Sequence, residues 1–467
     1  MHPSRACVGL PNAGHSRRTL LAKTAAAVAA SPLAACLPGG RTPTTPAKGQ
    51  PVTITYWHNW TELFEQMVIQ IANAFMEKNP DIKVEQQSIP ADFDDKVLSA
   101  IAGGTPPDVV MVFNSNGRLY TWADQGALQP LEDVGGAANV RKLKDWVHPA
   151  IWELGTYEGK VYGIAQWEQA YCIYYNKEYF REQGLDPEKG VQTIEDLLNY
   201  AERLTKVSDG ALVRLGYWDT DLWNWVPVFA GRFMDDANQK VVANEPNTVR
   251  ALEYLVQLRR RLERFDIAKI DEFRRTFGGG RTPQNPFLVG KLAMNRTGPW
   301  DLGTIKNYAP AGFEYGISNL PIPPGVDGLG VRTYGDIPAV PTGATKKEAI
   351  FRYISFLTGF GGEQEYANLF ITGRQPHVPS SEKAARGPAF QEVIKMYPGY
   401  EKFLKQLFEA KYFLFPPKIP NAAQFSTLLG QYVTRALNNE TTPRQALDEF
   451  TQRAQQELDA VRAAKRR

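Results

Sequence analysis

The sequence predicts an α/β fold in which helices cover both faces of a doubly wound sheet. Segments with a strand period alternate with segments with a helix period, which is the pattern of such a sheet. Residues 108–113 form a short continuous apolar run, typical of a parallel strand that is buried on both faces. The 467 residues, 43% of them apolar, can build more than one core, since a lobe usually holds about 100–200 residues.

An export signal is predicted at the start of the chain. Residues 1–35 begin with basic residues, continue with an alanine-rich apolar run and end in small residues, the order typical of a signal peptide. The apolar run at residues 20–30 is too short to span a bilayer, which takes about 20 apolar residues. Arg17 and Arg18 lie in a string that is similar to a twin-arginine export motif.

A lipid anchor is predicted at Cys36. Leu33-Ala34-Ala35-Cys36 resembles a lipobox, in which the cysteine becomes the lipidated first residue of the exported protein. Residues 36–51 then form a tether rich in proline and glycine. We therefore expect an exported protein that meets a membrane only through its lipid, on a periplasmic or other extracytoplasmic face.

Charge and cysteine content exclude several classes of function. The net charge is +3, but residues 1–35 hold four basic residues and no acidic one, so the remainder carries −1. That remainder lacks the basic surface by which proteins bind nucleic acids. Cys172 is the one cysteine after Cys36, so neither a disulfide framework nor a cysteine-based zinc site is expected. We interpret Cys172 as a small buried apolar side chain and expect no metal and no cofactor.

Five elements are predicted in order after the tether. They are a strand at 52–57, a helix at 64–75, a strand at 82–86, a helix at 92–102 in which Asp92 could be the N-cap, and the buried strand at 108–113. Further along, amphipathic helices are predicted at 193–204, 249–262 and 346–357, with a closing pair at 427–437 and 443–458.

Two clusters follow the first and third predicted strands. The first brings Trp57, His58 and Trp60, and the second brings Asn114. Ligands of open α/β sheets bind beyond the carboxyl ends of the strands, so both clusters are expected at a binding site. Aromatic rings and amide groups suit a sugar, whose C–H face stacks on rings while its hydroxyls form hydrogen bonds. The alternative for Trp57 is ordinary core packing at the end of a strand.

Seven further segments resemble one known family. They are 102–109, 126–131, 158–164, Tyr174-Tyr175-Asn176-Lys177 with Phe180, 290–294 and Gly298-Pro299-Trp300, together with the aromatic stretch at 218–225. Their order along the chain is similar to that in the extracellular solute-binding proteins, which include the maltose- and trehalose-binding proteins of bacterial importers. The resemblance implies a two-lobed periplasmic-binding-protein fold of type II, each lobe a doubly wound sheet with flanking helices, whose hinge is crossed more than once.

The resemblance also implies how the chain is divided. We expect residues 52–168 and 330–374 in the first lobe, and 169–329 and 375–467 in the second. The ligand then lies between the lobes, which close by a hinge motion.

Binding residues are carried over from the family onto this sequence. Stacking from the second lobe is expected from Trp223, Trp225 and Trp300, with further candidates at Trp167, Glu168, Tyr334, Arg374 and Phe425. For each tryptophan the alternative is core packing, and for Arg374 it is a surface salt bridge. Residues 278–281, although rich in glycine, lack the features of a phosphate-binding loop and are interpreted as a flexible loop.

The function predicted from these features is that of a binding subunit and not an enzyme. We expect a monomeric receptor that delivers a carbohydrate, from mono- to oligosaccharide, to the membrane permease subunits of an ABC importer. One alternative keeps the receptor but changes its cargo to glycerol phosphate or another non-sugar solute. Another is a secreted lipoprotein glycosidase, in which Asp219 and Asp221 are the paired carboxylates that hydrolysis requires.

Overall fold

The first sheet forms from the N-terminal strands in the predicted order. The computed structural model describes residues 50–373 and 375–465, which leaves the export signal, Cys36 and Arg374 outside the described residues. Strand β1 (Val52–His58) pairs in parallel with β2 (Ile82–Ser88) and with β3 (Val109–Phe113). Helices α1 (Glu62–Lys78) and α2 (Phe93–Ala102) connect these strands, so the predicted alternation of strands and helices is confirmed.

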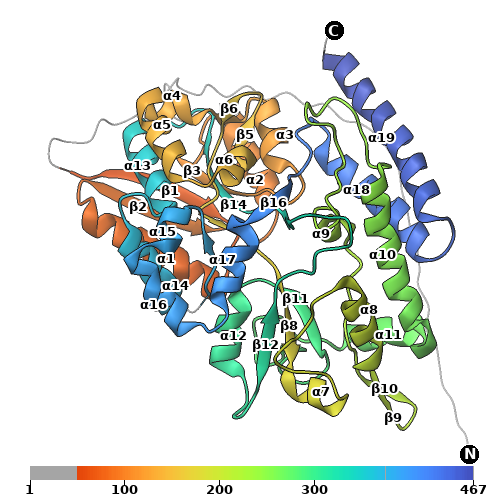
Figure 1. Ribbon diagram of the computed structural model, residues 1–467. Coiled ribbons are helices and arrows are strands. Elements are labelled where there is room, and N and C mark those ends of the chain that lie inside the picture. Colours follow the sequence, from red (N-terminus) through yellow and green to blue (C-terminus); the bar gives the residue numbers. More distant parts are fainter. Residues whose placement is uncertain (1–49, 374, 466–467) are drawn as a thin grey trace, which may run out of the picture. The chain divides into compact units, whose positions relative to one another are not determined.

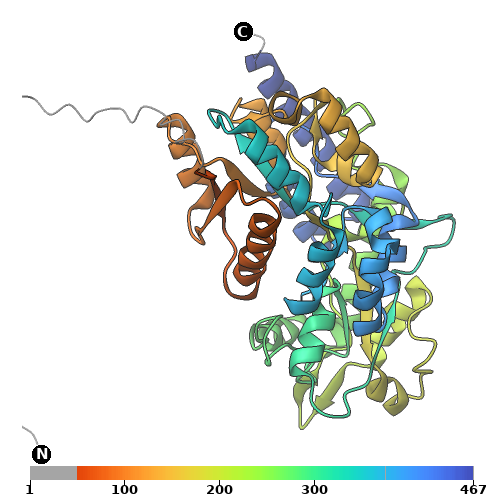
Figure 2. The same cartoon turned by 90° about the vertical axis from the view of Figure 1, so that its left-hand side faces the viewer.

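A later segment completes this sheet. Strand β14 (Asp336–Pro341) pairs antiparallel with β3 and with β4 (Leu128–Gln129), which gives the strand order β2-β1-β3-β14-β4. Figure 1 labels β1, β2, β3 and β14 of this sheet. Helices α13 (Lys347–Leu357) and α14 (Glu363–Thr372) then pack on α1. In Figure 2 the teal helix α13 lies beside the red strands at the start of the chain. Residues more than 200 positions apart in the sequence therefore share one layer.

The second sheet has three strands that pair antiparallel, whereas the strands of a doubly wound sheet are mostly parallel. Its central strand β8 (Cys172–Asn176) pairs antiparallel with both β11 (Met294–Thr297) and β12 (Tyr315–Ser318). Every side chain of β8 is buried, because helices and loops cover both of its faces. Cys172 is among them, as predicted, and has no disulfide partner.

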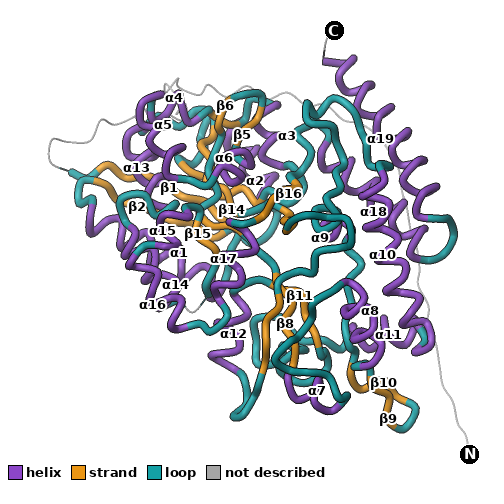
Figure 3. The backbone as a smooth tube through the Cα atoms, viewed as in Figure 1, coloured by secondary structure: helices purple, strands orange, loops and turns teal. Residues whose placement is uncertain are grey.

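Three long helices pack together beyond this sheet. Helix α10 (Pro246–Leu262) contacts α18 (Ala422–Leu437) and α19 (Pro443–Lys465), and these last two form the predicted closing pair (Figures 1 and 3). Helix α18 begins earlier and α19 ends later than the apolar periodicity predicts. None of the helices in the described ranges combines the length and the apolar character needed to cross a bilayer.

The remaining elements are short. The helices are α3 (Arg118–Asp124), α4 (Leu131–Gly135), α5 (Ala137–Trp146), α6 (Pro149–Leu154), α7 (Lys177–Glu182), α8 (Ile194–Arg203), α9 (Leu222–Trp225), α11 (Ile267–Arg275), α12 (Trp300–Tyr308), α15 (Glu382–Arg386), α16 (Pro388–Met396) and α17 (Tyr400–Phe408), with a 3-10 turn at Glu263–Phe265. The strands are β5 (Thr156–Tyr157), β6 (Lys160–Val161), β7 (Trp167–Glu168), β9 (Lys206–Ser208), β10 (Ala211–Arg214), β13 (Leu329–Arg332), β15 (Val378–Pro379) and β16 (Ala410–Leu414).

Two helix starts show how local sequence sets the ends of helices. Thr193 forms a capping box with Asp196 at the start of α8, so this helix begins where it was predicted. Asp92 occupies the N-cap position of α2, but its backbone is left-handed and its side chain accepts no hydrogen bond from the helix. The predicted capping role of Asp92 is therefore wrong, although the position of the helix is right.

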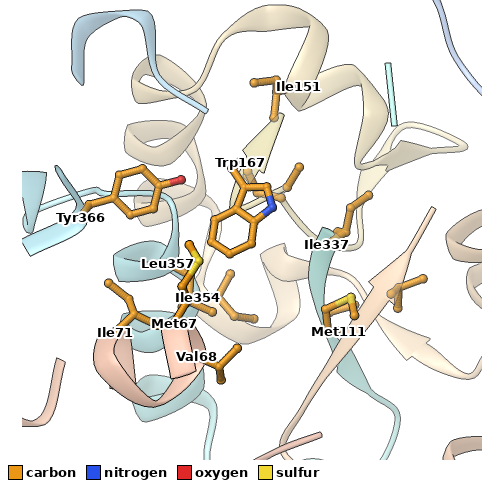
Figure 4. Close-up of a cluster of buried hydrophobic side chains, with 14 of the residues drawn as sticks. Met67, Val68, Ile71, Met111, Ile151, Trp167, Ile337, Ile354, Leu357 and Tyr366 are labelled. Carbon is orange, nitrogen blue, oxygen red and sulfur yellow. The ribbon is translucent and has the colours of Figure 1, made fainter. Parts of the chain in front are cut away.

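Buried side chains form two hydrophobic cores. The first surrounds the five-stranded sheet and includes Trp167, which lies among apolar side chains of α1, α13 and β14 (Figure 4). The second is formed by α8, α9, α10, α18 and α19 with part of β8. Buried residues of α16 and α17 belong to the first core. The same core also holds Tyr174 of β8 and Leu302 of α12, so it does not assign these helices to one lobe, and the lobe boundaries stay a prediction.

Candidate functional site

A continuous row of aromatic rings joins segments that are far apart in the sequence. We call it the ring row, and its members are Phe64, Trp60, Trp167, His377, Trp300, Tyr171, Tyr334 and Phe113. Trp60 stacks on Trp167 with a centroid distance of 5.4 Å and an angle of 20°. His377 lies 4.7 Å from the ring of Trp167 on one side and 5.6 Å from the ring of Trp300 on the other.

Strand ends and helix starts place these rings. Trp60 follows β1 and Tyr334 precedes β14, so both come from the first sheet. Tyr171 precedes β8 and Trp300 begins α12, which directly follows β11, so these two come from the second sheet. Trp167 pairs with Pro379 between β7 and β15, which brings His377 alongside. The ring row therefore connects the two sheets.

Two arginines lie beside the tyrosines near one end of the ring row. The hydroxyl groups of Tyr171 and Tyr334 are hydrogen-bonded to each other. The guanidinium carbon of Arg296 lies 4.3 Å from the ring of Tyr171, and that of Arg332 lies 4.5 Å from the ring of Tyr334. Such cation–π contacts fix the planes of both guanidinium groups.

Two aspartates hold these arginines. Asp219 accepts a hydrogen bond from Nε of Arg296 at 2.8 Å, and Asp221 accepts one from Nη1 of Arg332 at 3.0 Å. The side chain of Asp219 is only 9% exposed, whereas that of Asp221 is 45% exposed. The Arg296–Asp219 pair is thus a buried ion pair and the other lies near the surface. Arg332 also donates to the backbone oxygen of Ser115, which follows β3.

Two buried carboxyl groups lie beside the ring row without a basic partner. Glu168 accepts hydrogen bonds at Oε1 from the backbone N–H groups of Gln169 and Tyr334, at 3.1 and 3.2 Å, and its Oε2 has no partner among the described residues. Burial raises the pKa of Glu168. Asp336 accepts a 2.8 Å hydrogen bond at Oδ2 from the indole of Trp167, and burial raises its pKa to about 7.

Near the first strand, the predicted residues occupy positions with little solvent access. Trp57 is half-buried at the edge of the first core. His58 is fully buried, its Nε2 donates to Oε1 of Gln86 at 2.5 Å, and burial lowers its pKa. Asn114 is also buried, with Oδ1 accepting from the backbone N–H of Leu119 at the start of α3 and Nδ2 without a partner among the described residues.

The structure separates the tryptophans that the sequence grouped together. Trp300 is half-buried and belongs to the ring row, and Trp223 is half-buried beside Arg332, whose guanidinium carbon lies 5.4 Å from its ring. Trp225 is 0% exposed in the second core, where it packs on Tyr254 and donates to Asp219 at 3.0 Å. Its ring thus offers no surface to a ligand in this structure, which favours the core alternative. Phe425 is likewise buried in the second core.

Six members of this site are absent from the sequence prediction. They are Phe64, Phe113, Tyr171, His377, Arg296 and Arg332. The sequence held one indication of a site role for His377, since it is one of only three histidines after the predicted export signal. Arg296 and Arg332 offered none, because their importance rests on aspartates that are distant in the sequence.

A small cavity lies at the arginine end of the ring row. Its volume is about 10 Å³, room for roughly one water molecule. Its lining includes Tyr171, Asn224, Arg296, Arg332 and Gln406. In the described part of the chain, no group of three or more His, Cys, Asp or Glu side chains is arranged to hold a metal ion.

Comparison with known proteins identifies the class. The chain belongs to the family of bacterial extracellular solute-binding proteins, whose model matches residues 59–364. It is a solute-binding protein of an ABC transporter. The proteins that it resembles are binding proteins and not enzymes, and membership of this family fits an exported protein.

Curated relatives are distant but cover most of the chain. An uncharacterized ABC transporter extracellular-binding protein of Pyrococcus horikoshii is 25% identical over 383 residues, which is 77% of this chain and 80% of that protein. The sn-glycerol-3-phosphate-binding periplasmic protein of Escherichia coli K12 is 23% identical over 430 residues, or 87% of this chain and 92% of that one.

Solved structures confirm the predicted two-lobed fold. A mannotriose-bound structure, CpMnBP1, matches with a TM-score of 0.70 and 22% identity, covering 86% of this chain and 99% of that one. The sugar-binding protein of the phytopathogen Xanthomonas citri matches with a TM-score of 0.68 and 18% identity, covering 89% and 100%. A maltose-bound protein of T. maritima matches with a TM-score of 0.66 and 22% identity, covering 88% and 100%.

Proposed function

We propose that this protein delivers a carbohydrate to an ABC importer and that the ring row receives the sugar. The ring row carries the proposal, because it links aromatic side chains of the two sheets through His377. Flat rings from both sides can cover the two faces of a sugar. Trp60 and Trp300 are the principal candidates, since both are half-buried and so keep ring surface that a ligand can reach.

The chemistry around the rings suits a polyhydroxylated ligand. Sugar C–H groups stack on the faces of aromatic rings, which contributes on the order of 1 kcal/mol per ring beyond burial. Sugar hydroxyls need hydrogen-bonding partners, and Glu168, Asp336 and Asn114 each have a buried polar atom without a partner among the described residues. Buried polar atoms without partners are costly, so a bound ligand that satisfied them would gain affinity.

Closure of the two lobes follows from the same arrangement. A ligand shifts a conformational equilibrium only when it binds one state better than the other. A sugar that touches Trp60 and Trp300 together would do so only in the closed state. We propose lobes at 52–168 with 330–374 and at 169–329 with 375–467. The permease subunits of the importer would recognise the closed form of the monomeric receptor.

Glycerol phosphate is the second candidate for the cargo. The Escherichia coli relative is described as binding sn-glycerol 3-phosphate, and Arg296 and Arg332 lie at one end of the ring row. Both arginines already pair with aspartates, however, so neither is available to a phosphate without breaking an ion pair. That pairing favours the sugar. It also disfavours the glycosidase alternative, since Asp219 and Asp221 are the carboxylates that hydrolysis would use.

Export and anchoring are part of the proposal. The twin-arginine string at Arg17 and Arg18 and the lipobox that ends at Cys36 would send the protein across the membrane and leave it attached by a lipid. An anchored receptor would stay close to the permease.

A thermal-shift panel tests the proposed function. Ligand binding to the folded state raises its stability, by roughly 2.7 kcal/mol at a hundredfold excess over the dissociation constant. The full chain would be heated with mono-, di- and oligosaccharides, and with sn-glycerol 3-phosphate and a dipeptide as non-sugar controls. A rise in melting temperature with one group of saccharides alone supports the proposal. A rise with sn-glycerol 3-phosphate and with no saccharide contradicts it.

A further inference from the structure

A glycine-rich turn carries an arginine to the edge of the ring row. The backbone oxygen of Gly279 accepts hydrogen bonds from the N–H and the hydroxyl of Thr282, at 3.3 and 2.9 Å. The turn therefore closes around Gly280 and Arg281. Arg281 keeps exposed surface that a ligand can reach, although its guanidinium lies partly buried against rings, and this burial lowers its pKa.

Arg281 lies between rings that come from different parts of the fold. Its guanidinium carbon is 4.1 Å from the ring of Phe64, on α1 beside the first sheet, and 5.4 Å from the ring of Trp300, at the start of α12. A guanidinium that stacks on a ring keeps its N–H groups free at the edge of its plane. Those donors are available at the same rings that would stack on the sugar.

The charge of Arg281 is not paired, unlike that of the other two arginines of the site. Arg296 and Arg332 form ion pairs, whereas no carboxylate of residues 50–373 and 375–465 forms one with Arg281. The carboxyl groups of Asp301 and Asp336 interact with this charge electrostatically without forming an ion pair with it. Burial raises the pKa of each to about 7, although the positive charge of Arg281 opposes the rise. Near neutral pH these two carboxyl groups are only partly ionised, which leaves positive charge at this end of the ring row.

We propose that Arg281 is a specificity-determining residue that binds an acidic group of the ligand, so that the cargo is an acidic carbohydrate. This inference rests on the proposed function. The acidic group would be the carboxylate of a uronic acid or the phosphate of a sugar ester, since both present paired oxygens that match a guanidinium. The sugar ring would stack on the ring row while its acidic group meets the free edge of Arg281.

Calorimetric titration of the full chain tests the inference with matched probes. The probes are neutral mono- and disaccharides, their uronic acid forms, their phosphate esters, and sn-glycerol 3-phosphate as a phosphate that is not a sugar. We expect at least one acidic saccharide to bind about tenfold or more tightly than its neutral counterpart. Arg281→Gln should remove this preference, and Arg281→Lys should retain part of it. The control is Arg435→Gln on α18, whose guanidinium carbon lies 5.3 Å from the ring of Tyr432, and it should leave every affinity unchanged.

The other outcomes distinguish failure of this inference from failure of the proposed function. If neutral saccharides bind as well as acidic ones, or if Arg281→Gln weakens both equally, the inference is wrong and the proposed function stands. If sn-glycerol 3-phosphate alone binds, and only with Arg281 present, the carbohydrate proposal is wrong while the role of Arg281 toward anions survives. If no probe binds, both proposals are overturned.

Discussion

The imidazole of His377 stacks on the indole of Trp167 with their centroids 4.7 Å apart and their planes at 27°. This contact holds the segment before β15 against β7. On its other side His377 meets Trp300, so one buried histidine connects the indole of Trp167 in β7 with the indole at the start of α12. Burial lowers the pKa of His377 to about 3, and the ring therefore stays neutral at the pH of growth and can pack among aromatic rings without an ion partner.

Substitution of Trp300 is expected to affect binding more than folding. Trp300→Ala removes one stacking ring and should raise the dissociation constant of the preferred saccharide by about fivefold to tenfold, since stacking contributes on the order of 1 kcal/mol. Because Trp300 is half-buried, the free protein should lose less stability than it does on loss of a core tryptophan. Calorimetric titration gives the affinity, and urea unfolding gives the free energy of unfolding.

Trp225→Ala is the matched control for this substitution. Trp225 is fully buried against Tyr254, so its removal should lower the free energy of unfolding by about 3–5 kcal/mol. If Trp300→Ala costs as much stability and leaves the affinity unchanged, Trp300 belongs to the core and not to the site.

The two aspartates that hold arginines should differ in their effect on stability. Asp219→Asn leaves the buried Arg296 without a charged partner and should lower the free energy of unfolding by about 3–5 kcal/mol. Asp221→Asn affects a half-exposed ion pair and should cost about 1 kcal/mol or less. Urea unfolding of both variants at pH 7 measures the difference. Equal losses would show that the Arg296–Asp219 pair is not held as tightly as the geometry indicates.

Asp336 should make the folded protein less stable as pH rises. Burial raises its pKa to about 7, above the value of about 3.9 expected in the unfolded chain, so between these values the folded state holds a proton that the unfolded state has released. Stability therefore falls as pH rises toward 7. Asp336→Asn keeps an oxygen for the indole of Trp167 and cannot ionise. Its loss of stability between pH 5 and pH 7 should be smaller than that of the wild type by about 2 kcal/mol.

His377 acts in the opposite direction in the same experiment. Folding lowers the pKa of His377, so below about pH 6.5 the unfolded chain binds a proton at this histidine that the folded protein does not bind. The folded protein therefore loses stability as pH falls below about 6.5. Both proteins contain His377, so its contribution cancels in the difference between them. Urea unfolding at half-unit steps of pH gives the two curves, and parallel curves would contradict the role assigned to Asp336.

Cys36→Ser should release the protein from membranes. Without the cysteine no lipid can be attached at this position. Fractionation of a bacterial host that processes lipoproteins measures the protein in the membrane pellet and in the soluble fraction. Cys172→Ser, at a buried position in β8, is the control and should stay with the membrane. Membrane retention of Cys36→Ser would contradict the lipobox.

Local signals explain why much of the fold could be predicted. The apolar period of α1 and the capping box of α8 depend on residues within a few turns of one another, and both helices lie where they were predicted. The antiparallel pairing of β14 with β3 joins residues more than 200 positions apart, and no nearby pattern records it. Long-range pairings of this kind set the strand order of both sheets.

The candidate site could be predicted only in part, for the same reason. Trp223 and Trp225 are two residues apart and have the same side chain, but packing against α10 buries the second completely. Composition cannot distinguish them. The prediction of Trp60, Trp167, Trp300 and Tyr334 brought together residues that the structure places in one row. His377 belongs to that row and Arg281 lies beside it, and their roles depend on partners that are distant in the sequence.

A crystal structure of the full chain with the tightest-binding saccharide tests the central claim most directly. We predict a sugar ring in van der Waals contact with both Trp60 and Trp300, with hydroxyl groups hydrogen-bonded to Glu168 or Asp336. A saccharide bound elsewhere, for instance in the 920 Å³ groove that Tyr315, Lys402 and Lys411 help to line, would contradict it.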